Sequence, residues 1–140
     1  MQDGEDFRLF DALLDSRLLL YFYPKDMTSG CTVQAIGFRD MKDHLAAHGI
    51  RIVGVSKDSP STHLRFIEKY NLNFDLLADV EKKVCDQFGC LVEKSMYGKK
   101  YLGIQRSTFL IGKEGLIIKE WRNVNPKDHC DDVLQYIECE

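Results

Sequence analysis

A buried strand that leads directly into a cysteine-bearing helix constrains the fold more than any other feature of the chain. The apolar run from Leu18 to Tyr23 predicts a strand inside a sheet. The residues from 32 to 48 have the pattern of an amphipathic helix that ends near Gly49. The segment between them, PKDMTSGC, therefore places Cys31 in the first turn of that helix. The free N–H groups and the positive dipole end there favour a thiolate, the nucleophilic form of cysteine. A buried cysteine can also be a small packing residue, so position alone leaves both roles open.

The remainder of the chain alternates predicted strands and helices, without a linker, repeat or low-complexity segment. Gly112 and Gly115 bound the turn of a predicted hairpin. This order predicts an α/β protein with a mixed central sheet and helices on both faces. The 140 residues are the length of one domain. Further strands are expected at 51–56, 74–78, 107–111 and 116–121, and further helices at 61–70, 81–88 and 128–137.

The composition disfavours several classes of partner. Nineteen basic residues against 22 acidic residues give a net charge of −3, which offers no basic surface for nucleic acid or an anionic membrane. No apolar run approaches the ~20 residues of a membrane-spanning helix. The acidic, polar start of the chain is neither a signal peptide nor a transit peptide. We therefore expect a cytoplasmic protein that binds neither membranes nor nucleic acid.

The cysteines do not have the spacing of a metal site or of a structural disulfide framework. Their number is odd, and no C-x-x-C pair of the zinc or thioredoxin type occurs. We therefore expect no bound metal and at least one free thiol. The five cysteines are Cys31, Cys85, Cys90, Cys130 and Cys139.

The motif P-x-x-x-T-x-x-C, formed by Pro24, Thr28 and Cys31, resembles the active-site signature of the peroxiredoxins. The longer string YFYPKDMTSGCT resembles the bacterioferritin-comigratory branch, also called peroxiredoxin Q. The resemblance implies a single thioredoxin-like domain over residues 1–140, with a shortened N-terminal hairpin because few residues separate Phe7–Phe10 from the first buried strand. It extends through the segments 51–79, 103–121 and 123–137.

The same resemblance implies a thiol-dependent peroxidase that acts in antioxidant defence and redox homeostasis. Such an enzyme reduces hydrogen peroxide and organic hydroperoxides through a cysteine sulfenic acid, without a cofactor. Its reductant is thioredoxin, glutaredoxin or a small thiol, and the protein is a monomer or a weak homodimer.

Four residues carry the expected chemistry. Cys31 is the nucleophile that attacks the O–O bond. Thr28 can orient the thiolate and the peroxide, since a hydroxyl both donates and accepts; its alternative role is a helix cap. Pro24 shields the sulfur, or simply ends the strand. Arg106 offers a permanent charge and fork-shaped donors to the thiolate and to the transition state; it could otherwise be an ordinary surface arginine.

Several neighbouring residues have supporting or packing roles in this interpretation. Gln34 and Arg39 lie on the expected helix of Cys31, and Arg39 could equally be a solvated charge. His129 is expected to cap or pack the start of the last helix. Tyr21, Phe22, Phe109 and Trp121 are expected in the core.

The cysteine that would resolve the sulfenic acid is not evident. Many peroxiredoxin Q relatives carry a second cysteine five residues after the first, where this chain has Ile36, and others carry it on the next helix, where 61–70 holds none. A one-cysteine cycle resolved by an external thiol is favoured, and Cys130 is the first internal candidate. Two alternative functions are a thioredoxin-like disulfide reductase, which would need a cysteine in place of Gln34, and a redox-signalling or binding module without turnover.

Overall fold

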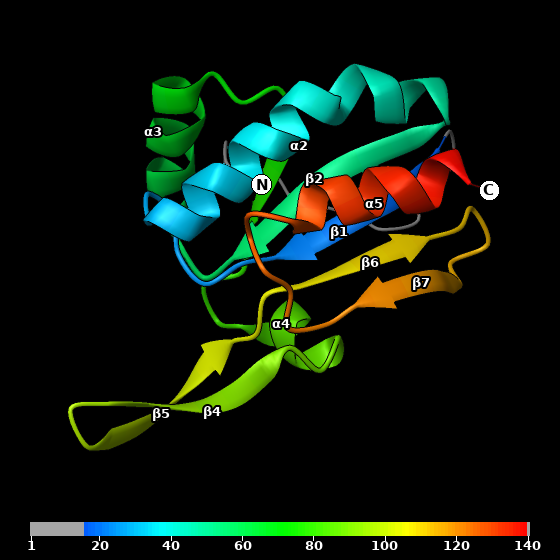
Figure 1. The fold of residues 1–140 in the computed structure, drawn as a ribbon. Coiled ribbons are helices and arrows are strands. Elements are labelled where there is room, and N and C mark those ends of the chain that lie inside the picture. Colours follow the sequence, from blue (N-terminus) through cyan, green and yellow to red (C-terminus); the bar gives the residue numbers. More distant parts are fainter. Residues whose placement is uncertain (1–15, 140) are drawn as a thin grey trace.

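The computed structural model describes residues 16–139, and its centre is a five-stranded mixed sheet (Figure 1). Two of its four pairs of neighbouring strands are parallel and the other two are antiparallel, so the sheet is mixed, as the alternation of elements predicts. In spatial order the strands are β3 (Asp75–Ala78), β2 (Ile50–Ser56), β1 (Arg17–Phe22), β6 (Ser107–Ile111) and β7 (Ile117–Trp121).

Helices cover both faces of this sheet, and they divide the core in two. One face is covered by α2 (Ser29–Ala47), α3 (Pro60–Tyr70) and α5 (His129–Glu138), and the other by the short α4 (Lys83–Gln87) (Figure 1). Successive residues of a strand point to opposite faces. In β1, Leu19 and Tyr21 accordingly pack beneath α2, whereas Leu20 and Phe22 pack on the side of α4.

The start of α3 shows why the sequence signals were informative. The Ser59 side chain accepts a hydrogen bond from the Thr62 N–H at 3.3 Å, and Pro60 occupies the first helical position. The helix ends at Asn71, which adopts the left-handed conformation with φ 51°. The predicted opening signal Ser59-Pro60 is confirmed.

A second, two-stranded sheet was not predicted. It consists of β4 (Leu91–Met96) and β5 (Lys99–Ile104), which pair antiparallel and extend away from the main sheet (Figure 1). Their turn is Tyr97-Gly98, and both residues have positive φ, 52° and 78°. Asparagine or glycine is usual at the first of these positions, so tyrosine hides the hairpin signal. The strand β5 ends two residues before Arg106 and so sets where that residue lies.

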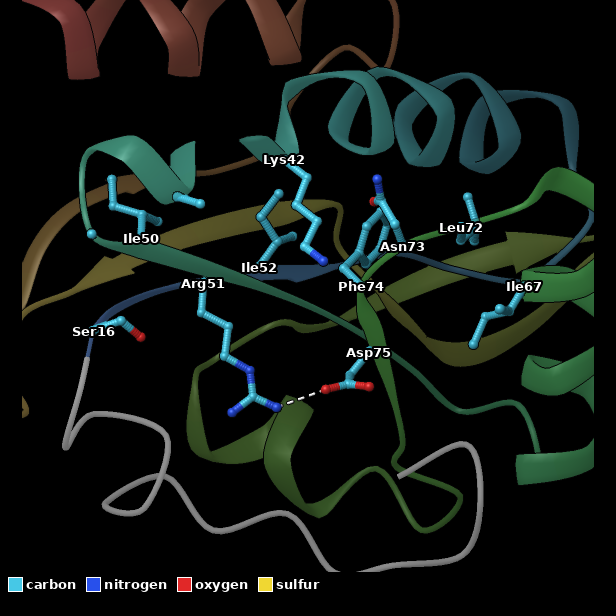
Figure 2. A pocket seen from close by; sticks show the side chains of 12 residues that line it. Ser16, Lys42, Ile50, Arg51, Ile52, Ile67, Leu72, Asn73, Phe74 and Asp75 are labelled. Carbon is cyan, nitrogen blue, oxygen red and sulfur yellow. Dashed lines mark hydrogen bonds and ion pairs between the residues drawn. The ribbon is translucent and has the colours of Figure 1, made fainter. Parts of the chain in front are cut away.

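Figure 2 shows a pocket at the amino end of β2, between α2, α3 and β3. Apolar side chains such as Ile52 and Phe74 line it, and an ion pair of 2.6 Å joins Arg51 to Asp75 on its rim. Cys31 follows the carboxyl end of β1, which runs parallel to β2. The pocket is therefore at the opposite end of these strands from the cysteine.

Two expectations concern the chain ends and membranes. The shortened N-terminal hairpin falls on residues that lie outside those described. Within residues 16–139, no helix has both the length and the apolar character needed to cross a membrane.

Candidate active site

A tight loop connects β1 to the first turn of α2. The Tyr23 N–H donates to the Val55 carbonyl at 3.0 Å, which extends the pairing with β2 by one residue. Met27 then takes a left-handed φ of 68°, and Thr28 is the N-cap of α2. Cys31 is the third residue of the helix, so its predicted position in the first turn is confirmed. No acidic side chain lies in that turn to oppose a negative charge on sulfur.

Arg106, which lies between β5 and β6, contacts Cys31 on α2. Its Nη2 donates to the Cys31 Sγ at 3.4 Å, and its Nη1 donates to Gln34 Oε1 at 2.8 Å. Gln34 is one helical turn after Cys31 and is completely buried. The planar fork of the guanidinium is thus fixed by one partner while it binds the other. Cys31 itself is only 1% exposed.

Glycine at position 30 accommodates the close approach of two other segments. A Cβ there would lie 3.2 Å from Cγ of Pro126 and 3.3 Å from Nη2 of Arg106. Such contacts are tighter than ordinary van der Waals distances, so a side chain at position 30 would crowd both Pro126 and the Arg106 guanidinium. The segment before α5 therefore packs directly on the cysteine turn.

Thr28 and Pro24 lie on the rim of the site. Thr28 is exposed, and its Oγ1 donates to the Lys25 carbonyl at 2.9 Å. The side chain makes no capping hydrogen bond to the helix, although Thr28 occupies the N-cap position. The lone pairs of its oxygen remain acceptors. Pro24 is half-buried and directly follows the last residue that pairs with β2.

The other cysteines are placed differently from Cys31. All five thiols are free, and of the other four only Cys139 is exposed. Burial raises the pKa of Cys130 to about 12 and raises the pKa values of Cys85 and Cys90. Cys130 belongs to the same core cluster as Cys31, and its Sγ donates to the Gln34 carbonyl at 3.5 Å. A Cβ on Gly37 would lie 2.6 Å from that sulfur, so Cys130 is packed tightly against α2.

His129 has a packing role rather than a capping role. It is buried, its Nε2 lies 2.6 Å from Thr108 Oγ1, and its ring stacks edge-on against Phe38 and Trp121. Burial, with a smaller effect of the Arg106 charge, lowers the pKa of His129 from 6.5 to about 4. The ring is therefore uncharged at neutral pH. Arg39, by contrast, binds the Tyr70 carbonyl at 2.7 Å.

The buried His129 should make stability fall in mild acid. Between pH 6.5 and about 4 the unfolded chain binds a proton at this histidine and the folded chain does not. The free energy of unfolding should therefore decrease as pH falls through that window, by on the order of 1 kcal/mol per pH unit from this group. Urea unfolding of the wild type and of His129→Asn over that range measures it. The variant should show the shallower slope, and parallel slopes would contradict the assignment.

The sequence did not reveal a buried polar cluster behind the loop. Asp26 contacts Tyr23 and His63, and its backbone N–H contacts Asp58. One signal existed, since His63 shares a helical face with the apolar Phe66 and Ile67. Possible ligand atoms of Asp26, Asp58 and His63 all lie within 4.8 Å of one another, but each residue is already hydrogen-bonded within the protein. The cluster therefore gives no metal assignment.

Comparison with known proteins agrees with the geometry of the cysteine turn. A sequence model of the AhpC/TSA family matches residues 1–120. The chain belongs to this family. Peroxiredoxin Bcp of Bacillus subtilis (strain 168) is 50% identical over 132 residues, which cover 94% of this chain and 83% of that protein. Peroxiredoxin Bcp of Escherichia coli (strain K12) is 47% identical over 136 residues, which cover 97% and 86%.

A solved structure extends the agreement to the fold. The bacterioferritin comigratory protein of Xanthomonas campestris, studied for alkyl peroxide reduction, superposes with a TM-score of 0.91 at 38% identity, covering 99% of this chain and 87% of that one. The predicted thioredoxin-like α/β fold and the predicted Bcp/peroxiredoxin Q branch are confirmed. The AhpC/TSA chain is accordingly a thiol-dependent peroxidase, with peroxides as substrates and thiol proteins as reductants.

Proposed function

We propose that Cys31 is the peroxidatic cysteine and that Thr28, Arg106 and Pro24 complete its site, for both hydrogen peroxide and organic hydroperoxides. The observation that carries this assignment is the 3.4 Å contact from Arg106 Nη2 to Cys31 Sγ at a helix N-terminus. A cationic donor and the free N–H groups of the helix both stabilise negative charge on that sulfur. Cys90 also lies near an arginine, Arg122, but burial dominates there and raises the pKa of Cys90, and Cys90 is not in the first turn of a helix.

The reaction follows from this arrangement. The Cys31 thiolate attacks the terminal oxygen of the hydroperoxide, an S–O bond forms, and the O–O bond breaks. The other oxygen leaves with the electron pair as hydroxide or alkoxide and takes up a proton from solvent. Arg106 stabilises the charge that moves onto this oxygen. Thr28 supplies an acceptor for the peroxide hydroxyl, and the Pro24 ring limits the access of water. Cys31 is left as a sulfenic acid.

The sulfenic acid is then reduced by a thiol from outside the chain. That thiol attacks the sulfur, water leaves, and a mixed disulfide forms; a second thiol releases Cys31 and leaves the reductant as a disulfide. Three internal cysteines are buried and have raised pKa values, which disfavours each of them as the attacking thiolate. Thioredoxin, glutaredoxin and small thiols are the candidate reductants.

A variant that keeps only Cys31 tests this one-cysteine cycle. Alanine suits Cys85, Cys90 and Cys130, because serine would bury an unpaired hydroxyl, and serine suits the exposed Cys139. We expect this variant to keep most of the wild-type rate of peroxide consumption with dithiothreitol as reductant.

A single substitution tests whether Cys130 resolves the Cys31 sulfenic acid. If Cys130→Ala alone stopped turnover with thioredoxin, and a Cys31–Cys130 disulfide appeared in non-reducing peptide maps, the one-cysteine cycle would be wrong. Cys130 would then be the resolving cysteine, and α5 would have to move away from α2 to release it.

The location, the assembly and the domain organisation of the protein stay predictions. The odd cysteine count agrees with a cytoplasmic location, where thiols are kept reduced. A monomer or a weak homodimer is the expected assembly. One domain over residues 1–140 is the expected organisation.

A further inference from the structure

The loop that carries the peroxiredoxin signature contains a carboxylate that the proposed chemistry does not use. Asp26 lies between Pro24 and Thr28, and its side chain is completely buried. Its Oδ1 accepts a hydrogen bond of 2.5 Å from the Tyr23 hydroxyl, and its Oδ2 lies 2.6 Å from His63 Nδ1. A buried carboxylate is costly unless it is paired and hydrogen-bonded, and here both oxygens are engaged.

Both ring nitrogens of His63 have hydrogen-bond partners. His63 is completely buried on α3, and its Nε2 lies 3.1 Å from the Leu77 carbonyl on β3. A carbonyl can only accept, so Nε2 carries a hydrogen. The short contact between Nδ1 and Asp26 Oδ2 is the second hydrogen bond of the ring. Burial raises the pKa of the Tyr23 phenol, which stays protonated and donates to Asp26.

A second connection holds the backbone of the same residue. The Asp26 N–H donates to Asp58 Oδ2 at 2.9 Å, and the Ser56 hydroxyl donates to that oxygen at 2.7 Å. Ser56 ends β2, and Asp58 lies just before α3. Residue 26 is therefore attached by its side chain to His63 on α3, and by its main chain to the segment that connects β2 with α3.

Both attachments of Asp26 are next to Met27, the strained residue of this loop. Met27 follows Asp26 and has a left-handed φ of 68°, which a side chain with a Cβ rarely adopts. Such a conformation costs free energy and persists only where the surroundings fix it. Thr28, the N-cap of α2, follows Met27, and Cys31 lies three residues further. A loop that relaxed at Met27 would move both Thr28 and Cys31 relative to Arg106.

We propose that Asp26 and His63, with Tyr23, form a clamp that positions the Cys31 loop for reaction with peroxide. The inference rests on the proposed role of Cys31. Replacing a buried ion pair by apolar residues is often neutral for stability, so stability alone does not account for this arrangement. Peroxide reduction, in contrast, needs the Cys31 sulfur, Thr28 and Arg106 at fixed positions relative to one another. A misplacement of about 1 Å can lower a rate about 100-fold.

Two rates measured on the same sulfur test the clamp. One is the rate at which hydrogen peroxide oxidises Cys31, which needs the assembled site. The other is the rate at which iodoacetamide alkylates Cys31, which needs only access to a thiol that is now 1% exposed. In Asp26→Ala we expect oxidation to slow by about 10- to 100-fold while alkylation becomes faster. A purely structural role in a folded protein would leave the oxidation rate unchanged.

The conservative variant and a matched control complete the comparison. In Asp26→Asn the amide can accept from Tyr23 and donate to a neutral His63, so oxidation should stay within a few-fold of wild type. His44→Ala removes a histidine–carboxylate pair of 2.9 Å with Glu138, but on the surface, and should change neither rate. If Asp26→Ala does not fold, Tyr23→Phe removes one bond of the clamp and should shift both rates in the same directions, by less.

The buried cysteines report on unfolding in the same samples. Peptide mass spectrometry after alkylation should find Cys85, Cys90 and Cys130 unmodified in Asp26→Ala. If they react together with Cys31, the pair supports the whole fold and the proposal is overturned. It is overturned equally if folded Asp26→Ala and Tyr23→Phe oxidise at the wild-type rate. A wild-type protein whose Cys31 did not react with peroxide would instead refute the proposed function.

Discussion

The Cys31→Ser variant should consume no peroxide above background when dithiothreitol is the reductant. A serine hydroxyl is not ionised at neutral pH, so the position beside Arg106 Nη2 would hold a neutral group that does not attack the O–O bond. No other thiol in the described structure offers the same environment. Burial raises the pKa values of Cys85, Cys90 and Cys130, and the exposed Cys139 is the C-cap of α5. Loss of absorbance of hydrogen peroxide, or of a hydroperoxide, measures the rate.

The control for this result is Cys139→Ser. It makes the same chemical change at the exposed cysteine and should keep the wild-type rate with dithiothreitol. If Cys31→Ser kept more than a few per cent of the activity, another residue would be the nucleophile.

The Arg106→Met variant should lose about 100-fold or more in the rate of Cys31 oxidation. Methionine fills much of the same space but removes the donor to sulfur and the charge that faces the leaving oxygen. It also frees the buried Gln34 Oε1, which accepts from Arg106 at 2.8 Å. Arg106→Lys should recover part of the rate, since it restores the charge but not the fork that binds both partners. Stopped-flow oxidation at several peroxide concentrations measures the second-order rate constant.

Arg39→Met is the matched control for Arg106. Arg39 lies on the same helix as Cys31, but its guanidinium binds the Tyr70 carbonyl and Asp40. The rate of Cys31 oxidation should therefore be unchanged in this variant. Equal losses in Arg39→Met and Arg106→Met would mean that stability or net charge, rather than contact with sulfur, controls the rate.

Much of the fold could be predicted because its signals are local. The run from Leu18 to Tyr23 is apolar on both faces, since helices cover both sides of β1. The sequence Ser59-Pro60 sets the start of α3, and Gly112 with Gly115 sets the turn of the β6–β7 hairpin. Each of these features needs only neighbouring residues to specify it.

The remaining features depend on residues far apart in the sequence. The β4–β5 hairpin is mostly exposed and turns at Tyr97, so neither an apolar pattern nor a usual turn residue marked it. Asp26 and His63 are 37 positions apart, and only the packing of α3 beside the loop brings them together. The burial of Cys130 against Gly37 has the same origin, since α5 meets α2 through the tertiary fold alone.

The central claim is that Cys31 itself takes one oxygen from the peroxide. Adding one equivalent of hydrogen peroxide to the reduced protein, trapping with a sulfenic-acid reagent and mapping the peptides by mass spectrometry tests it most directly. The account predicts the trapped adduct on the peptide that contains Cys31, with Cys85, Cys90, Cys130 and Cys139 still reduced. An adduct on another cysteine, with Cys31 still a free thiol, would contradict it.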